Sequence, residues 1–105
     1  MRENLQKTRP YTVVILHKTS KRDSDPGADK IIWEHGRRNF QLRKDGKLSV
    51  VCAIRDESDV SGVGVFSTEL AETRRIMDGD PAVKAGIITY ETHSTRSFPG
   101  DSLPK

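Results

Sequence analysis

The segment GDPAVKAG, residues 79–86, lies between a helix-like stretch and a strand-like one and decides how the last third of the chain folds. Asp80 stands directly before Pro81, which is typical of a helix start: the carboxylate accepts a backbone N–H, and proline is favoured at the first helical position. Gly79 and Gly86 are expected to end the preceding helix and this short one in left-handed conformations. The segment therefore predicts a one-turn helix with Asp80 as its N-cap.

Four strands are predicted from runs rich in β-branched and aromatic residues, three before this segment and one after it. Their expected positions are residues 11–18, 47–54, 60–67 and 87–93. The glycines at 62 and 64 fall inside the third run, which indicates that something packs close to the backbone there.

Two longer helices are predicted at residues 30–44 and 68–78. Asp29 and Thr68 are the expected N-caps, and Asp45-Gly46 is the expected stop of the first helix.

The remaining segments are expected to be irregular and to leave a single domain. That domain covers residues 11–105, including a C-terminal tail at 94–105, and residues 1–10 are expected to be flexible. A loop is expected at residues 19–29.

The resulting order, β-α-β-β-α-β, is the ferredoxin-like arrangement, an α+β fold. It predicts an antiparallel sheet with both helices on one face and the other face bare. With 105 residues, of which 33% are hydrophobic, the chain offers a thin core. A homodimer that packs sheet to sheet would cover the bare face and is therefore expected.

Composition argues against several classes of protein. The net charge is only +3, and acidic residues lie among the Lys and Arg pairs, so no nucleic-acid-binding stripe is predicted. No segment is apolar and long enough to span a membrane, and the first residues lack the apolar stretch of a signal peptide, so a cytoplasmic protein is expected. Cys52 is the single cysteine and lies in an apolar run, which predicts a reduced, buried, inert thiol.

Two polar residues fall on the apolar side of the first predicted helix. At about 100° per residue, His35 and Asn39 lie at roughly 40° and 80° from Ile31, inside the apolar arc. One interpretation is a core histidine that is satisfied by a backbone carbonyl or by Asn39. The other is a general acid or base that faces a pocket between helix and sheet and needs a carboxylate to orient it.

Other polar candidates are weaker. His17 and His93 lie near strand ends and could reach a pocket, but a solvent-exposed edge position is the favoured explanation for both. Arg55 and Arg96 could bind a substrate carboxylate in bidentate fashion, with a surface role as the alternative. No Asp or Glu stands at ligand spacing from the three histidines, so no metal site is predicted.

Two segments resemble the YciI-related (YCII) domain proteins: IMDGDPAVKAGIITYETHSTRSFPGD at residues 76–101, and IIWEHGRRNF at residues 31–40. The resemblance covers roughly residues 11–101, and the DPAVKAG loop is its most specific element. It implies a ferredoxin-like fold of the dimeric α/β-barrel type. It also implies a catalytic His35–Asp80 dyad in a small pocket, with lyase-like or elimination chemistry on small, often ring-shaped molecules. The sequence departs at Thr95, where many members carry an aromatic residue.

Two functions follow as hypotheses. The first is a cofactor-independent lyase or isomerase in which His35 and Asp80 carry acid–base chemistry and Asn39, His17 and Arg55 bind a small substrate. The second is a non-catalytic small-ligand-binding or structural dimer, in which the pair only holds helix to sheet. RNA binding through the sheet is disfavoured because the third strand lacks the aromatic pair of RNA-recognition domains.

Overall fold

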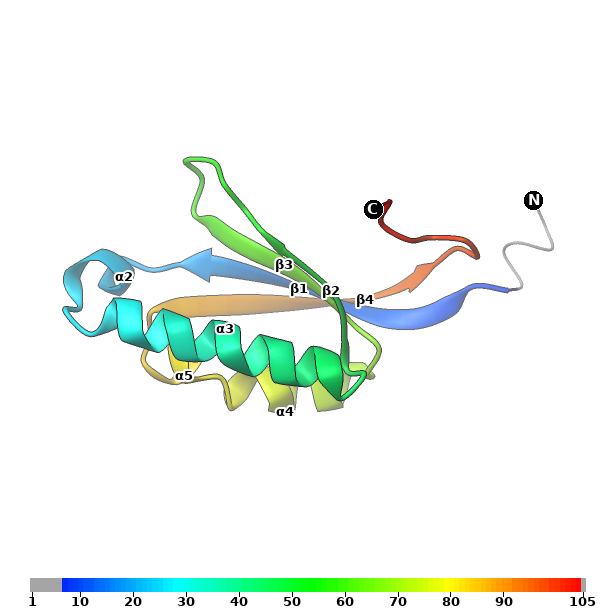
Figure 1. The fold of residues 1–105 in the computed structure, drawn as a ribbon, viewed down its shortest axis with the longest axis horizontal. Coiled ribbons are helices and arrows are strands. Elements are labelled where there is room, and N and C mark those ends of the chain that lie inside the picture. Colours follow the sequence, from blue (N-terminus) through cyan, green and yellow to red (C-terminus); the bar gives the residue numbers. More distant parts are fainter. Residues whose placement is uncertain (1–6, 105) are drawn as a thin grey trace.

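The computed structural model describes residues 7–104, which form one four-stranded antiparallel sheet with helices on one face (Figure 1). In chain order the elements are β1 (Arg9–Lys18), α2 (Lys21–Ser24), α3 (Ala28–Lys44), β2 (Leu48–Ala53), β3 (Val60–Phe66), α4 (Leu70–Asp78), α5 (Pro81–Lys84) and β4 (Ile88–Ser97). The spatial order of the strands is β2-β3-β1-β4. This is the ferredoxin-like arrangement, so the expected α+β class is confirmed.

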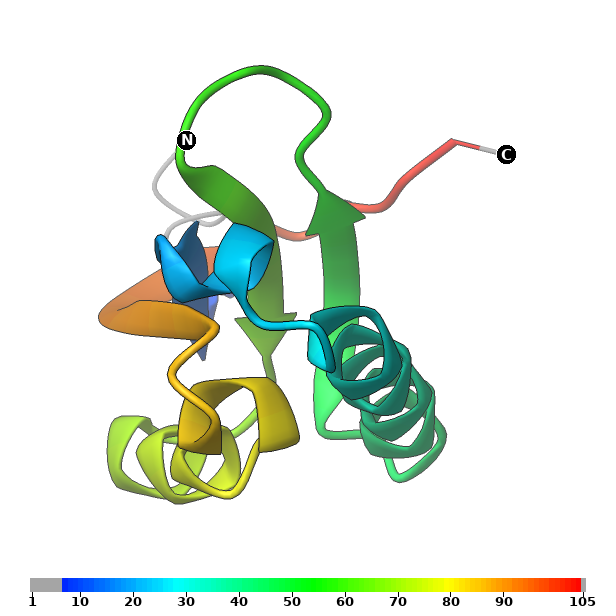
Figure 2. The same cartoon turned by 90° about the vertical axis from the view of Figure 1, so that its left-hand side faces the viewer.

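Helices α3, α4 and α5 form a single layer beneath the sheet, and the one-turn helix α2 lies past the end of β1 (Figure 1). Figure 2 shows α3 on one side of this layer and the α4–α5 pair on the other. The larger core cluster lies between these helices and the strands, and comprises Val14, Leu42, Leu48, Phe66, Ile76 and Met77. A smaller cluster, Ala28, Ala82, Ile87 and Ile88, fixes the start of α3 against α5. Leu16 and Val83 pack against both clusters and join them.

The other face of the sheet carries no helix. Side chains directly opposite one another on paired strands share a face. Val13 therefore shares this open face with its partner Val65, and Ile15 shares it with Val63. Both pairs come from the central strands β1 and β3, so the middle of the open face is apolar, as expected for a surface that needs a partner.

The segment that precedes α3 differs from the expected loop. Residues 19–29 contain the one-turn helix α2, and α3 begins at Ala28, two residues earlier than predicted. Asp29 is not the N-cap: Gly27 occupies that position, and Asp25 accepts a hydrogen bond from its backbone N–H at 2.8 Å. Ala28 is buried, so the smaller core cluster holds the helix start in place of a side-chain cap.

Thr68 is also not a cap. Glu69 is the N-cap of α4 and makes no side-chain cap bond. Thr68 instead lies within 2.7 Å of Thr73 through the two hydroxyl oxygens, and its carbonyl accepts from Thr12 Oγ1 at 2.8 Å. Thr68 thus links the start of α4 to β1.

The segment GDPAVKAG folds largely as predicted. Asp80 is the N-cap of α5, and Gly86, at φ 74°, ends it in the left-handed conformation. The N–H groups of Gly86 and Ile87 donate to the carbonyls of Val83 and Ala82, which is the Schellman pattern. Gly79 ends α4 in the right-handed conformation, so the expected left-handed turn is wrong there.

Strand ends and exposure also differ from the sequence prediction. Arg9 and Pro10 belong to β1, and β4 continues through residues 94–97, with Arg9 opposite Ser97. The expected flexible N-terminus therefore includes two paired residues, while residues 1–6, and Lys105 of the tail, lie outside the described residues.

Cys52 is exposed rather than buried, because β2 is an edge strand. Trp33 and Phe40 are also exposed, at 64% and 68%, so neither belongs to the core of the chain. None of the helices within residues 7–104 is long and apolar enough to cross a membrane.

Candidate functional site

The structure brings His35 and Asp80 into direct contact. His35 Nδ1 lies 2.6 Å from Asp80 Oδ2, across the interface between α3 and α5. The second carboxylate oxygen, Oδ1, accepts the N–H of Ala82 at 2.8 Å. One side chain thus caps a helix and holds an imidazole, because a carboxylate has two oxygens with separate lone pairs.

Asp80 is completely buried. A buried carboxylate is tolerated only when it is paired and hydrogen-bonded. Burial by itself raises the pKa of Asp80, but the hydrogen bond and charge of His35, the N–H of Ala82 and the charge of Arg38 together lower it below its usual value. Asp80 is therefore ionised at neutral pH.

Arg38 lies one turn of α3 beyond His35 and contributes charge to the pair. Its Nη1 lies 3.7 Å from Asp80 Oδ2, which is an ion pair but too long for a hydrogen bond. Gly79 makes room for this guanidinium: a Cβ at that position would lie 3.1 Å from Arg38 Nη2. The glycine before Asp80 is thus explained by a close approach rather than by its backbone angle.

The ionised carboxylate fixes the tautomer of His35. An ionised carboxylate only accepts hydrogen bonds, so Nδ1 must carry the proton that is shared with Asp80. In the neutral imidazole, Nε2 then carries a lone pair and can accept a proton. Asn39 Nδ2 lies 3.3 Å from Nε2 and acts as a weak donor to it. The pair therefore presents a basic nitrogen beside Asn39, with the imidazole oriented from behind.

His35 and Asn39 line a cavity of about 500 Å³ between α3, β2 and the ends of β1 and β4. The side chain of His35 is 13% exposed, so it is largely shielded from solvent. A volume of this size falls in the range of sites that hold small organic molecules. Apolar side chains form most of the walls: Leu16, Ile32, Phe40, Val51, Ile54 and Ile88.

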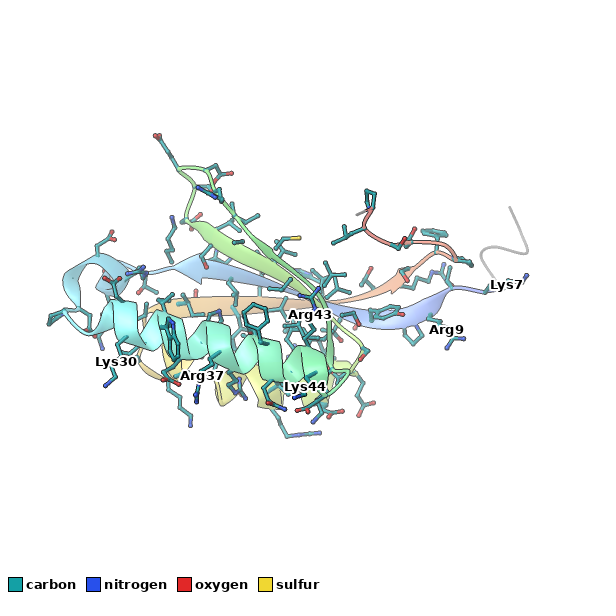
Figure 3. All side chains as sticks on the ribbon, in the orientation of Figure 1. Lys7, Arg9, Lys30, Arg37, Arg43 and Lys44 are labelled. Atoms are coloured by element: carbon teal, nitrogen blue, oxygen red, sulfur yellow. The ribbon has the colours of Figure 1, made fainter. Side chains whose placement is uncertain are left out.

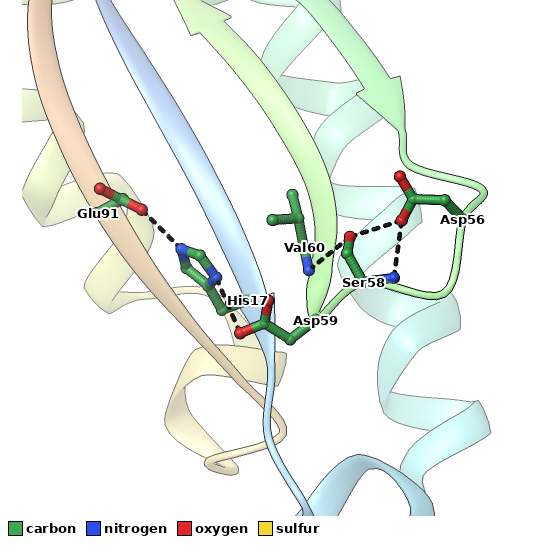
Figure 4. A network of polar contacts seen from close by, with 6 residues as sticks. All are labelled: His17, Asp56, Ser58, Asp59, Val60 and Glu91. Carbon is green, nitrogen blue, oxygen red and sulfur yellow. Dashed lines mark hydrogen bonds and ion pairs between the residues drawn. The ribbon is translucent and has the colours of Figure 1, made fainter.

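His17 does not reach this cavity. It follows Leu16 in β1, and successive residues of a strand point to opposite faces of the sheet. Figure 4 shows it on the open face, between β1 and β4, with the helices behind the sheet. Its Nε2 lies 2.7 Å from Glu91 and its Nδ1 lies 3.5 Å from Asp59. The hydrogen bond with Glu91 is the main reason that the pKa of His17 is raised.

The other candidates lie away from His35 as well. Arg55 is exposed in the turn between β2 and β3, and it is not among the residues that line the cavity. His93 lies on β4 and contacts Glu91 at 2.8 Å on the open face, and Arg96 is exposed near the end of that strand. Of the five predicted site residues, the structure therefore brings together His35, Asp80 and Asn39.

Sequence reasoning missed three cationic residues that line the cavity: Lys18, Arg22 and Arg43. Each comes from a different element, namely β1, α2 and α3. Pairs of basic residues looked like solvated faces in the sequence. The strand alternation that places Lys18 on the same face as Leu16 was the one signal available.

Within residues 7–104, no group of three or more His, Cys, Asp or Glu side chains is arranged to hold a metal ion. The chemistry that the arrangement can perform is proton transfer at Nε2 of His35, assisted by the charge of Asp80.

No family model matches the chain, and no curated protein matches it. Among solved structures, it is similar to the 5-chloro-2-hydroxyhydroquinone dehydrochlorinase TftG from Burkholderia phenoliruptrix AC1100, determined in complex with 2,5-dihydroxybenzoquinone. The TM-score is 0.51 and the identity 16%, over 83% of this chain and 92% of that chain. A dimeric ferredoxin-like protein from an uncultured marine organism gives a TM-score of 0.45 at 11% identity, over 100% and 99% of the two chains. At these identities the likeness to TftG shows the fold alone.

Proposed function

We propose that the chain is a YCII-related, cofactor-independent lyase or isomerase of small molecules, with His35 as general base and Asp80 as the residue that orients it. The observation that carries this proposal is the 2.6 Å contact between Nδ1 of His35, which lines the cavity, and a completely buried Asp80. A base of this kind needs its tautomer fixed and its positive charge stabilised after it takes a proton, and Asp80 does both.

The step follows from this geometry. Nε2 of His35 takes a proton from a carbon of the substrate, and the electron pair of that C–H bond moves to form a new double bond. In an elimination, the leaving group departs from the neighbouring carbon with its bonding electrons. In an isomerisation, the same imidazolium returns the proton at another carbon. Asp80 remains ionised throughout and stabilises the imidazolium.

The similarity to TftG supports the elimination variant. That enzyme is named a dehydrochlorinase, and removal of HCl needs a base for the proton and a path for chloride. The proposed substrate class is accordingly a small ring-shaped molecule that the apolar walls of the cavity can hold. We extend the proposal to a single domain over residues 11–105, a cytoplasmic protein, and a homodimer that pairs its open sheet faces. The apolar pairs Val13–Val65 and Ile15–Val63 support that dimer.

The test is a screen of halogenated hydroquinones for chloride release and of unsaturated ring compounds for spectral change. Turnover by a general base predicts that His35→Gln lowers kcat by about 10²–10⁴. His93→Gln is the control, because it also removes an imidazole but lies on the open face, and it should leave kcat within twofold. An active His35→Gln variant would show that His35 is not the base.

The second candidate is a non-catalytic ligand-binding or structural dimer. It is favoured by one observation: Asp80 serves the fold directly as the cap of α5. In that case His35→Gln lowers the melting temperature, small ring compounds bind without being converted, and every compound in the screen is recovered unchanged.

A further inference from the structure

We infer that the molecule taken into the His35 cavity is a small organic anion, with an apolar ring and a negative charge borne on oxygen. This inference rests on the proposed function and names the substrate class of the same site. It follows from the charges that surround the cavity, and these are separate from the His35–Asp80 pair.

The charged side chains that line the cavity are all cationic. Lys18, Arg22 and Arg43 reach it from three elements, and no Asp or Glu of the described chain is among the lining residues. Over the whole chain the two kinds of charge are nearly balanced, with 18 Lys and Arg against 15 Asp and Glu. A concave surface lined by one sign of charge concentrates ions of the opposite sign.

Two of these cations are not neutralised by neighbours. Lys18 and Arg43 have no ion-pair partner within residues 7–104, and Lys18 has only a longer-range interaction with Asp56. Arg22 contacts Asp29 at 3.3 Å, but that carboxylate is 96% exposed and points to solvent. Solvent competes with such an exposed pair, so Arg22 keeps much of its ability to bind another anion.

Arg43 differs from the other basic residues of α3. Figure 3 shows Arg43 on the side of α3 that faces the strands, whereas Lys30, Arg37 and Lys44 point away from the sheet. It lies eight residues after His35, which corresponds to about 12 Å along the helix. Lys18 and Arg22 lie on the opposite side of His35 from Arg43, near the start of α3. An anionic group can therefore be held at either end of the cavity while a carbon of the ring lies near Nε2 of His35.

The cations also suit the proposed chemistry. Removal of a proton from carbon places negative charge on the substrate, and fixed positive charges stabilise that charge as it develops on an attached oxygen. Arginine is well matched to a planar oxyanion such as a carboxylate, because its guanidinium offers two parallel donors. The apolar walls suit the ring of such an anion, since Leu16, Ile32 and Phe40 can enclose a flat ring.

The test compares three probes of similar size: benzoate, benzamide and benzylammonium. Each is titrated against the intact protein at pH 7.5 and followed by amide shifts in NMR spectra. We expect saturable benzoate binding, with the largest shifts at Ile32, Gly36 and Val51, and at least tenfold weaker binding of the other two. Arg43→Gln should weaken benzoate about tenfold, as expected for the loss of one charge-assisted contact, and leave benzamide unchanged. Lys44→Gln removes the same charge from the neighbouring position and should leave benzoate within twofold.

The inference is overturned if benzoate fails to saturate, if benzamide binds as tightly as benzoate, or if Arg43→Gln and Lys44→Gln have equal effects. These results are distinct from failure of the proposed function. Benzoate binding that persists in an active His35→Gln variant would retain the anion site and reject the base. Loss of activity in His35→Gln without any anion preference would retain the base and reject the substrate class.

Discussion

Replacement of Asp80 by asparagine tests the proposed mechanism with a change of one side-chain group, from a carboxylate oxygen to an amide nitrogen. Asparagine is as good an N-cap as aspartate, so its oxygen should keep the 2.8 Å bond from the N–H of Ala82. That bond then decides the orientation of the amide. The NH₂ group must face His35 Nδ1, where the carboxylate oxygen now lies at 2.6 Å.

The expected result is a reversal of the His35 tautomer. An NH₂ group donates, so Nδ1 must become the acceptor and the proton must move to Nε2, the nitrogen proposed as the base. The base is then blocked, and kcat should fall by about 10²–10⁴, which corresponds to roughly 3–5 kcal/mol. The protein should lose only about 1 kcal/mol of stability, because a charge-assisted bond becomes a neutral one, and its melting temperature should fall by about 4–8 °C.

Nitrogen-15 NMR of the imidazole rings measures the tautomer without any substrate, and spectra of His35→Gln assign the His35 signals. The wild type should show the proton on Nδ1 and Asp80→Asn should show it on Nε2. Asp80→Ala separates the cap from the tautomer, because it removes the cap and should cost about 1 kcal/mol more than Asp80→Asn. A wild-type protein with the proton on Nε2, or a variant with an unchanged tautomer, would refute the argument that Asp80 orients the base.

Three further predictions concern the surroundings of the site. Gly79→Ala should push Arg38 away from Asp80 and so raise the pKa of Asp80 toward its usual range, as measured by carbon-13 NMR titration. The free energy of unfolding should change by less than about 1 kcal/mol, because alanine favours the helix end. The pKa of His17 is raised in the folded protein, so protonated His17 stabilises the fold fully below the unfolded pKa of 6.5. This stabilisation is lost as pH rises through the folded pKa. The difference in free energy of unfolding between wild type and His17→Gln should therefore shrink over that pH range in urea titrations. Val65→Glu places a charge in the middle of the open face and should convert the proposed dimer to a monomer in sedimentation equilibrium, and an unchanged mass would place the dimer contact elsewhere.

The fold could be predicted because its information is local. The period-2 pattern of the strands, the helical periodicity and the Asp80-Pro81 start each depend on neighbouring residues, and their order alone selects the ferredoxin-like topology. The errors occur where distant packing replaces a local signal. Ala28 starts α3 because it is buried against α5, which no cap-like residue in its own segment could indicate.

The site was predicted in part for a related reason. The helical wheel placed His35 and Asn39 on the inner side of α3, and one turn of helix brings them together. Lys18 and Arg43 could not be recognised, because they are 25 residues apart in the sequence and only the strand–helix packing brings them to one cavity. Cys52 was misjudged because an apolar run does not reveal whether its strand is central or at the edge.

The double role of Asp80 links the chemistry of the site to the completion of the fold. The helix that it caps, α5, has four residues and cannot form by itself, because helix nucleation is unfavourable and so short a segment has little to offset it. Its position depends on packing of Ala82 against Ala28, and on Ile87 and Ile88 at the start of β4. The contact between Asp80 and His35 therefore depends on the packing of α5 against α3 and against the start of β4.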